Sequence, residues 1–275
     1  MRIGVGIISW DRPQYLAQLI ESLEKNILTE TNFHLFQDGA VCKFTNEELA
    51  DTNKIVESIG VFYKSKLPNK HYHVRDKNVS VAINQFEAMQ YLRKNYEQFI
   101  FLENDVIVSS NFMILTRRLL EQFKKDERVA CISPGLRLLC KENDIGKNLN
   151  KLKYSKGHFW AEACWSSKWE RVEKEYMTYY NIVKNTPYRK RDEVAIRALF
   201  ARNGHKAPTT SQDQGKDWAI QKAGMKRARL IVNRATGIGD HGIHSTPAKL
   251  KKSLDGHNPI YVYKEELDIK EFKLG

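Results

Sequence analysis

Short apolar runs alternate with helical patterns through the first 135 residues, and this alternation constrains the fold more than any other feature. The runs with the length of strands are 3–8, 33–36, 71–74, 99–102 and 129–133. The candidate helices between them are 13–23, 46–59, 79–92 and, capped by Ser110, 112–123. Such alternation predicts a mostly parallel sheet with crossover helices on its faces, which is an α/β fold.

The pattern loosens beyond Pro134, where an aromatic-rich segment, 157–165, follows a polar stretch. The elements expected here are a loop at 141–156, helices at 167–180, 188–202 and 217–223, and a strand or docking segment at 259–263. Because no internal repeat or low-complexity linker interrupts the chain, we expect one domain over 1–275 that ends in a charged extension, 246–275.

The chain carries 45 Lys and Arg against 33 Asp and Glu, and a net charge of +12 predicts an anionic partner. Nucleic acid, an anionic membrane face and a sugar nucleotide all meet that requirement. Nucleic acid is disfavoured because the sequence has no aromatic RNA-binding motif, recognition-helix signature or zinc-finger spacing.

The absence of long apolar segments and of paired cysteines predicts a cytoplasmic protein. No apolar stretch reaches the roughly 20 residues that span a bilayer, and the N-terminal run is too short for a signal peptide. The four cysteines are widely spaced without a CxxC pair, which is typical of reduced thiols.

Two acids stand at the end of the apolar run 99–102, at Glu103 and Asp105. The carboxyl ends of parallel strands line the crevice where open α/β sheets bind ligands. Carboxylate oxygens suit Mg²⁺ or Mn²⁺, and these metals suit a diphosphate. The alternative is that both acids are solvated turn residues. Gly4-x-Gly6 does not indicate a dinucleotide fold, because the third glycine is missing and both lie inside the strand.

Six segments in order resemble the GT-A-fold glycosyltransferases, most of all their inverting bacterial and N-acetylglucosaminyltransferase-like members. Those of the first half are Ser9-x-Asp11-Arg12-Pro13, Phe36-Gln37-Asp38-Gly39, Asn78-Val79-Ser80-Val81-Ala82-Ile83-Asn84 and Phe101-Leu102-Glu103-Asn104-Asp105. The aromatic segment 159–165 and the glycine-rich segment 237–244 strengthen the likeness, which covers residues 2–245.

The resemblance implies a GT-A (Rossmann-like) fold with a mixed, mostly parallel sheet flanked by helices. It implies transfer of a sugar from a nucleotide-diphosphate donor, UDP by family frequency, with inversion and with Mn²⁺ or Mg²⁺ as cofactor. The acceptor would be a hydroxyl of a saccharide, a lipid-linked saccharide or a glycoprotein, as in polysaccharide biosynthesis. Residues 1–108 would bind donor and metal, and 109–245 would bind the acceptor and catalyse. The alternative is a non-catalytic glycan- or anion-binding module.

By the resemblance, Asp105 coordinates the metal, and Glu103 approaches the ribose or the metal through water. Asn104 stands where the family often carries another acid. His241 or His244 would complete the metal shell or contact the diphosphate. A neutral imidazole suits Mn²⁺ better than Mg²⁺.

The remaining donor contacts also follow from the resemblance. Asp38 would hydrogen-bond the base or ribose, although an ordinary Asp-Gly turn is the alternative. The other donor residues lie after the first strand or near a helix start, and they are Ser9, Asp11, Arg12, Asn78 and Asn84. Asp11 and Asn78 have the alternative role of helix caps.

The second half must supply a general base and an acceptor surface. Asp217 resembles the family's catalytic acid at a helix start, with Asp213 as the alternative base and Asp192-Glu193 as a weaker pair. Helix charge compensation is the alternative role for Asp217. The acceptor residues expected in the aromatic segment are Trp160, Glu162 and Trp165. The basic runs 189–191 and 249–252 are candidates for peripheral contact with an anionic membrane.

Overall fold

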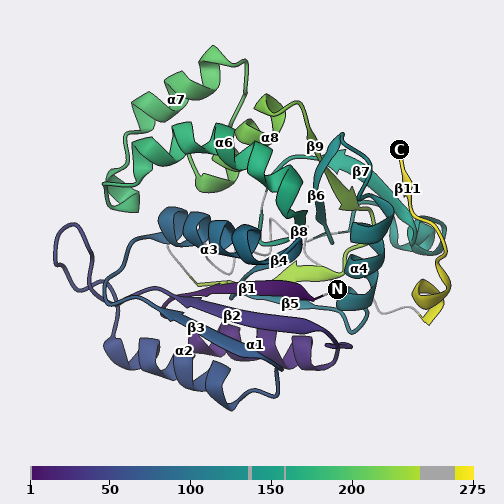
Figure 1. Ribbon diagram of the computed structural model, residues 1–275, viewed down its shortest axis with the longest axis horizontal. Coiled ribbons are helices and arrows are strands. Elements are labelled where there is room, and N and C mark those ends of the chain that lie inside the picture. The colour runs from purple at the N-terminus through teal and green to yellow at the C-terminus, as the bar shows by residue number, and fades with distance from the viewer. Residues whose placement is uncertain (1, 136–137, 158, 242–263) are drawn as a thin grey trace.

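The computed structural model describes residues 2–135, 138–157, 159–241 and 264–275, and its centre is a nine-stranded sheet (Figure 1). The strand order is β11-β7-β9-β6-β8-β4-β1-β2-β3. One half of the sheet is a parallel set, made of β3 (Lys70–Val74), β2 (Thr31–Gln37), β1 (Ile3–Ser9) and β4 (Gln98–Glu103). The strands expected at the start of the chain are confirmed, and all four carboxyl ends lie at one edge.

The other half of the sheet is mixed. Its strands are β8 (Ala161–Trp165), β6 (Val129–Ser133), β9 (Lys226–Leu230), β7 (Lys151–Ser155) and β11 (Lys273–Leu274). β8 runs antiparallel to both β4 and β6, β9 is parallel to β6, and β7 is antiparallel to β9. A separate antiparallel pair joins β5 (Val106–Val108) to β10 (Ala235–Gly237). The predicted fold class, α/β with a mixed, mostly parallel sheet, is confirmed.

Helices cover both faces of the sheet. The first face packs against α1 (Pro13–Glu24), α2 (Thr52–Lys64) and α4 (Phe112–Gln122). The second face packs against α3 (Val81–Asn95), α6 (Ser166–Val183), α7 (Glu193–Arg202) and α8 (Gln212–Lys222). In Figure 1, α1 and α2 lie below the strands, and α3 and α6 lie above them.

The two glycines inside β1 are explained by packing beneath α3. A Cβ atom at Gly4 would collide with the ring of Tyr96, and one at Gly6 would collide with Leu92. Ile3, Val5 and Ile7 alternate with these glycines and enter the core on the opposite face. The glycines therefore allow close helix–sheet contact, and the rejection of a dinucleotide motif agrees with this position.

Several expected element boundaries are wrong. Residues 141–156 are not a loop, since they contain η1 (Glu142–Asp144), α5 (Ile145–Asn148) and β7. The helix expected over 46–59 is α2, which begins only after Asp51 accepts a hydrogen bond from Asn53 N at 2.8 Å. Ser110 does not cap α4, because the N-cap position is Asn111. The basic helix expected over 188–202 is divided into η2 (Tyr188–Lys190) and α7.

The end of the chain returns to the sheet through η3 (Lys264–Asp268) and β11. Glu266 forms a buried ion pair with Arg234 at 2.9 Å, and Asn111 Nδ2 donates to Glu266 at 3.1 Å. Phe272 N donates to Gln122 Oε1 at 2.8 Å. The strand or docking segment expected at 259–263 lies outside the described residues. None of the helices in the described ranges has the length and apolar character needed to cross a membrane.

Candidate active site

The carboxyl ends of β1, β2 and β4 bring the predicted donor residues to one edge of the sheet. Ser9 and Gln37 are cross-strand neighbours at the ends of β1 and β2, and Ile8 faces Glu103 of β4. Asp38 N donates to Ser9 O at 2.9 Å. Parallel topology therefore gathers three segments that lie far apart in the sequence.

Asp38 is buried and holds the loop that leads into α3. Its carboxylate accepts hydrogen bonds from Val79 N at 2.9 Å and from Gly39 N at 3.1 Å. Burial raises the pKa of Asp38 to about 6, although these backbone donors lower it in part. Gly39 is required because a Cβ atom there would meet the backbone of Lys77. Asp38 is thus more than an exposed Asp-Gly turn.

The segment before α3 is shaped by Asn78 and Ser80. Ser80 has a φ of 80°, a left-handed conformation that is uncommon for a residue with a side chain. Asn78 accepts from Ser80 N at 3.0 Å and donates to Gly39 O at 3.2 Å, so it braces the turn and does not cap α3. Asn84 lies in the first turn of α3, near the helix start as expected, and donates to Phe36 O at 3.1 Å. Both asparagines support the loop next to Asp38.

Arg12 connects the β1 loop to the acidic turn after β4. Its guanidinium donates to Asp105 Oδ2 at 2.8 Å and to Asn104 Oδ1 at 3.3 Å. Arg12 is the N-cap residue of α1, which excludes the helix-cap role for Asp11. Gly239 packs directly against the Asp105 carboxylate and has no room for a Cβ atom. Arg12 and Gly239 therefore fix the direction of Asp105.

Two residues that sequence reasoning missed lie beside this turn. The Tyr15 hydroxyl donates to Asp240 Oδ1, and Nδ1 of His241 is 2.8 Å from the same oxygen. Burial, followed by the bond to Asp240, raises the pKa of Tyr15. Tyr15 lies on the apolar stripe of α1. Its hydroxyl is the signal that could have identified it, because a buried tyrosine hydroxyl usually has a hydrogen-bond partner. Arg12 links this pair to the acidic turn, because its Nη1 lies 3.4 Å from His241 O and 2.8 Å from Asp105 Oδ2.

Glu103 joins the donor edge to the second half of the chain. Burial, and then the negative charges of Asp105 and Asp213, raise the pKa of Glu103 well above its ordinary range. Gln85 Nε2 donates to Glu103 Oε1 at 3.4 Å. Lys216 is also buried, and its Nζ lies 3.3 Å from Asp213 Oδ1. The structure thus adds Lys216 to the acids that the sequence singled out.

Asp213, not Asp217, stands at the start of the helix. α8 is capped by the Ser211 side chain and carries Asp213 in its first turn. Asp217 lies in the middle of α8, where it accepts a hydrogen bond from Gly157 N at 2.6 Å. Burial raises the pKa of Asp217 to about 6, and Arg227 opposes that shift. The helix-start position expected for Asp217 is wrong, because α8 begins earlier than 217.

The three residues expected to bind the acceptor lie in different environments. Trp160 is partly buried beside the acidic turn: its carbonyl accepts from Glu103 N at 2.8 Å, and its ring packs on Gly237. Trp165 is a core residue, 2% exposed, whose Nε1 donates to Leu120 O at 2.9 Å. Glu162 is fully buried in an ion pair with Arg227 at 3.1 Å. Both side chains are buried on β8, which lies in the sheet between β4 and β6, so neither offers an open surface to an acceptor in this structure.

The acidic turn fits a metal held mainly by substrate. In the described ranges, no three His, Cys, Asp or Glu side chains form a preformed metal cage. Mg²⁺ and its relatives usually bind through one or two carboxylates and the substrate's phosphates. Asp105 offers a carboxylate at the turn, and Asp240 orients the ring of His241 as carboxylates orient metal-binding histidines. His244 lies outside the described residues.

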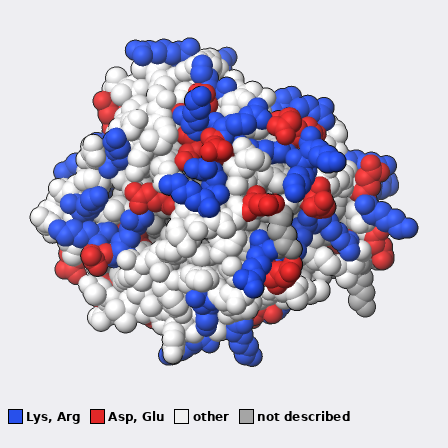
Figure 2. All heavy atoms as spheres, in the orientation of Figure 1, with Lys and Arg blue, Asp and Glu red and all other residues white. Residues whose placement is uncertain are grey.

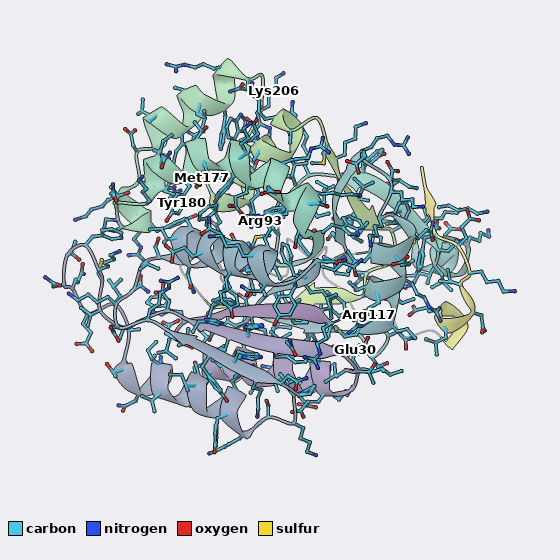
Figure 3. All side chains as sticks on the ribbon, in the orientation of Figure 1. Glu30, Arg93, Arg117, Met177, Tyr180 and Lys206 are labelled. Atoms are coloured by element: carbon cyan, nitrogen blue, oxygen red, sulfur yellow. The ribbon has the colours of Figure 1, made fainter. Side chains whose placement is uncertain are left out.

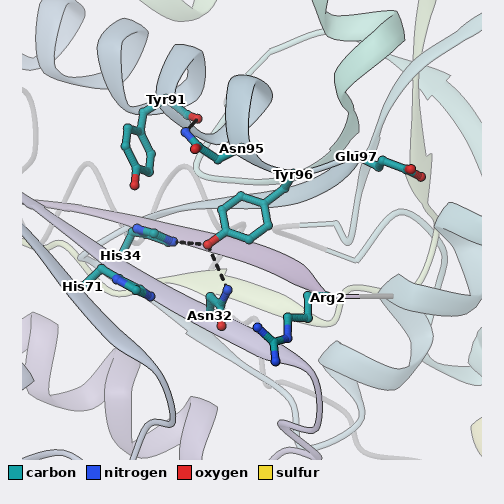
Figure 4. A pocket seen from close by; sticks show the side chains of 8 residues that line it. All are labelled: Arg2, Asn32, His34, His71, Tyr91, Asn95, Tyr96 and Glu97. Carbon is teal, nitrogen blue, oxygen red and sulfur yellow. Dashed lines mark hydrogen bonds between the residues drawn. The ribbon is translucent and has the colours of Figure 1, made fainter.

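A hollow of about 400 Å³ opens at the opposite edge of the sheet (Figure 4). Its lining includes His34, whose Nε2 is 2.6 Å from the Tyr96 hydroxyl and whose Nδ1 is 3.1 Å from His73 Nε2. Burial lowers the pKa of His34 to about 3. The hollow lies at the amino ends of the strands, far from the acidic turn, so it does not serve the same site.

Comparisons with known proteins support the GT-A-type fold. Staphylococcus aureus TarS superposes with a TM-score of 0.51 at 12% identity, over 87% of this chain and 37% of TarS. TarS 1–349 in complex with UDP-GlcNAc superposes with a TM-score of 0.50 at 13% identity, over 89% of this chain and 60% of that one. The chain therefore spans less than two thirds of these neighbours. No family model and no curated protein sequence matches it.

Proposed function

We propose that this chain is a glycosyltransferase that takes a sugar from a nucleotide-diphosphate donor. The observation that carries the proposal is the convergence of Asp38, Arg12 and the 103–105 turn at the carboxyl edge of the parallel strands. The fold is shared with a TarS fragment crystallised with UDP-GlcNAc, which makes a uridine donor the first candidate.

The position of each of these residues suits one role in binding the donor. The buried Asp38 carboxylate is positioned for hydrogen bonding to the base or ribose, and the Arg12 guanidinium for the diphosphate. Asp105, with His241, would hold Mn²⁺ or Mg²⁺. Because Arg12 already occupies Oδ2 of Asp105, coordination would use the other carboxylate oxygen. The bound metal would neutralise negative charge on the leaving diphosphate.

Asp213 is the base that we propose for inversion. It lies in the first turn of α8, where the helix dipole stabilises a carboxylate, and its charge acts on Glu103. Asp217 is bound to Gly157 N and is influenced by Arg227, so it faces the scaffold. In the proposed step, Asp213 removes the proton of the acceptor hydroxyl as its oxygen attacks the anomeric carbon. The bond to the diphosphate oxygen breaks on the opposite face.

Donor binding is tested by thermal unfolding with UDP, GDP and dTDP, each with Mn²⁺ or EDTA. A ligand at about 100 times its dissociation constant stabilises by about 2.7 kcal/mol. We expect a Mn²⁺-dependent shift with UDP that is lost in Asp105→Asn and retained in the matched control Asp268→Asn, which changes an exposed acid of η3. If no nucleotide stabilises the chain, or if Asp105→Asn leaves the shift intact, the non-catalytic binding module replaces the transferase as the favoured function.

The base is tested by release of UDP from a UDP-sugar, with and without saccharide acceptors. Loss of a general base costs about 10²- to 10⁴-fold in rate. We expect that loss in Asp213→Asn with unchanged UDP binding, and a smaller loss in Asp217→Asn. The reverse order would reassign the base to Asp217. A product that keeps the donor's anomeric configuration would exclude inversion.

A further inference from the structure

The segment between α6 and α8 concentrates positive charge. Residues 184–206 hold seven Lys and Arg and two Asp and Glu, so five of the twelve net positive charges lie in 23 of the 275 residues. Five of these cations are exposed and form what we call the basic surface: Arg189, Lys190, Arg197, Arg202 and Lys206. Figure 2 shows Lys and Arg side chains gathered at the top of the view, where α7 lies, and Figure 3 shows Lys206 there.

Most charges of the basic surface have no neutralising acid within the described ranges. Arg197 is 3.8 Å from Glu193. The other four cations form no ion pair with any residue that the structure describes. Four exposed cations of this kind in one short segment create a positive potential that favours an anionic partner.

The segment is held rigidly on α6 and α8. Phe200 of α7 is buried, and its ring stacks parallel to that of Tyr179 at a centroid distance of 6.2 Å. The guanidinium of Arg191 lies 4.2 Å from the centre of the Tyr188 ring. Arg191 also donates to Thr210 Oγ1 at 2.9 Å, directly before the Ser211 cap of α8. The backbone that carries the basic surface is therefore anchored to α6 and α8, so a partner need order only the exposed side chains.

The basic surface also borders the proposed catalytic centre. Arg191 follows Arg189 and Lys190 directly in the chain, and its guanidinium donates to Thr210 Oγ1 at 2.9 Å. Thr210 lies three residues before Asp213, which occupies the first turn of α8, so the exposed cations begin close to the start of that helix. A chain bound along the basic surface would have its end beside Asp213.

We propose that the basic surface docks an anionic acceptor, a saccharide chain carrying carboxylate or phosphate groups, next to Asp213; this inference rests on the proposed transferase activity. A bilayer would contact only the outer cations of α7. An acceptor chain would also follow the surface past Tyr188 to the start of α8. That continuity favours a soluble polyanionic chain over a lipid surface.

The test is direct binding of two probes, oligogalacturonate and inorganic polyphosphate, at low and at physiological salt. Arg189→Gln/Lys190→Gln removes the two exposed cations that stand between Tyr188 and Arg191 in the chain. Lys124→Gln/Lys125→Gln is the matched control, because it removes two adjacent exposed cations beyond the end of α4. Each exposed charge contact changes affinity by about 2- to 5-fold, so we expect about 4- to 25-fold weaker binding for the first variant only. Salt should weaken the wild-type interaction.

Vesicle binding and the control variant separate acceptor docking from attraction to a membrane or to charge in general. Binding to phosphatidylcholine vesicles that contain phosphatidylglycerol, without binding to either soluble probe, would overturn the inference in favour of a membrane. Equal losses in the two double variants would overturn it in favour of general charge attraction.

Stabilisation by UDP is measured in every variant, so that failure of the docking inference and failure of the proposed function are distinguishable. If stabilisation by UDP persists while the anionic probes do not bind, only the docking inference falls. If the wild-type chain binds no nucleotide, the proposed function falls and the docking inference with it.

Discussion

The buried ion pair between Arg234 and Glu266 offers the sharpest test of how the end of the chain supports the site. Arg234 immediately precedes β10, and the chain then reaches Gly239, which packs on Asp105. The side chains of Arg234 and Glu266 are 1% and 0% exposed, and they are 2.9 Å apart. We predict that Glu266→Gln strongly destabilises the protein although it preserves the shape of the side chain.

The magnitude follows from the burial of both partners. Removing one charge of a buried pair costs about 3–5 kcal/mol, because the remaining charge is left without its counterion. For a chain of this size, 1 kcal/mol corresponds to about 2–4 °C in melting temperature, so the expected fall is about 6–20 °C. Glu271→Gln, an exposed change in the same C-terminal segment, should stay within about 0.5 kcal/mol of wild type.

The assay is thermal and denaturant unfolding of the full chain. A third variant, Arg234→Met/Glu266→Leu, removes both charges together and should recover most of the lost stability. If Glu266→Gln unfolds within about 1 kcal/mol of wild type, the pair is not effectively buried in solution, and the reasoning from burial is refuted.

Two further predictions concern the donor edge. Gly239→Ala should displace the Asp105 carboxylate and abolish the Mn²⁺-dependent nucleotide shift, whereas Gly146→Ala, which has open space around it, should retain that shift. Burial raises the pKa of Asp38 from 3.8 to about 6, so the folded chain holds this proton more tightly than the unfolded chain. The resulting stabilisation is complete at low pH and is lost as pH rises through 6. Relative to Asp38→Asn, wild type should therefore lose about 2–3 kcal/mol between about pH 4 and 7 in denaturant titrations, and a constant difference would contradict this.

The parallel half of the sheet could be predicted from the sequence because its signals are local. Strand-length apolar runs followed by helical periods define a parallel sheet, and parallel strands present their carboxyl ends at one edge. The acids and the arginine that follow those runs must then meet. The contact of Arg12 with Asp105 shows that the segments after β1 and β4 do meet.

The proposed base was harder to choose from the sequence, because the choice depends on where a helix begins. Both Asp213 and Asp217 belong to α8, and only the cap at Ser211 decides which of them occupies the first turn. A serine before a helix is a local signal that the sequence carries. The apolar residues between Trp218 and Ala223 favoured a later start, since the first turns of α8 contain mainly polar residues that are nevertheless buried.

By itself, the sequence determined the α/β class, the parallel half of the sheet and which residues follow the carboxyl ends of its strands. Only the tertiary structure decided that Glu162 and Trp165 are buried. Their strand, β8, runs antiparallel between β4 and β6 in the sheet. Only the tertiary structure brought Asp240 to Tyr15 and Glu266 to Arg234. The difference is physical: periodicity reports which face of an element is apolar, whereas pairing between distant segments depends on the packing of the whole chain.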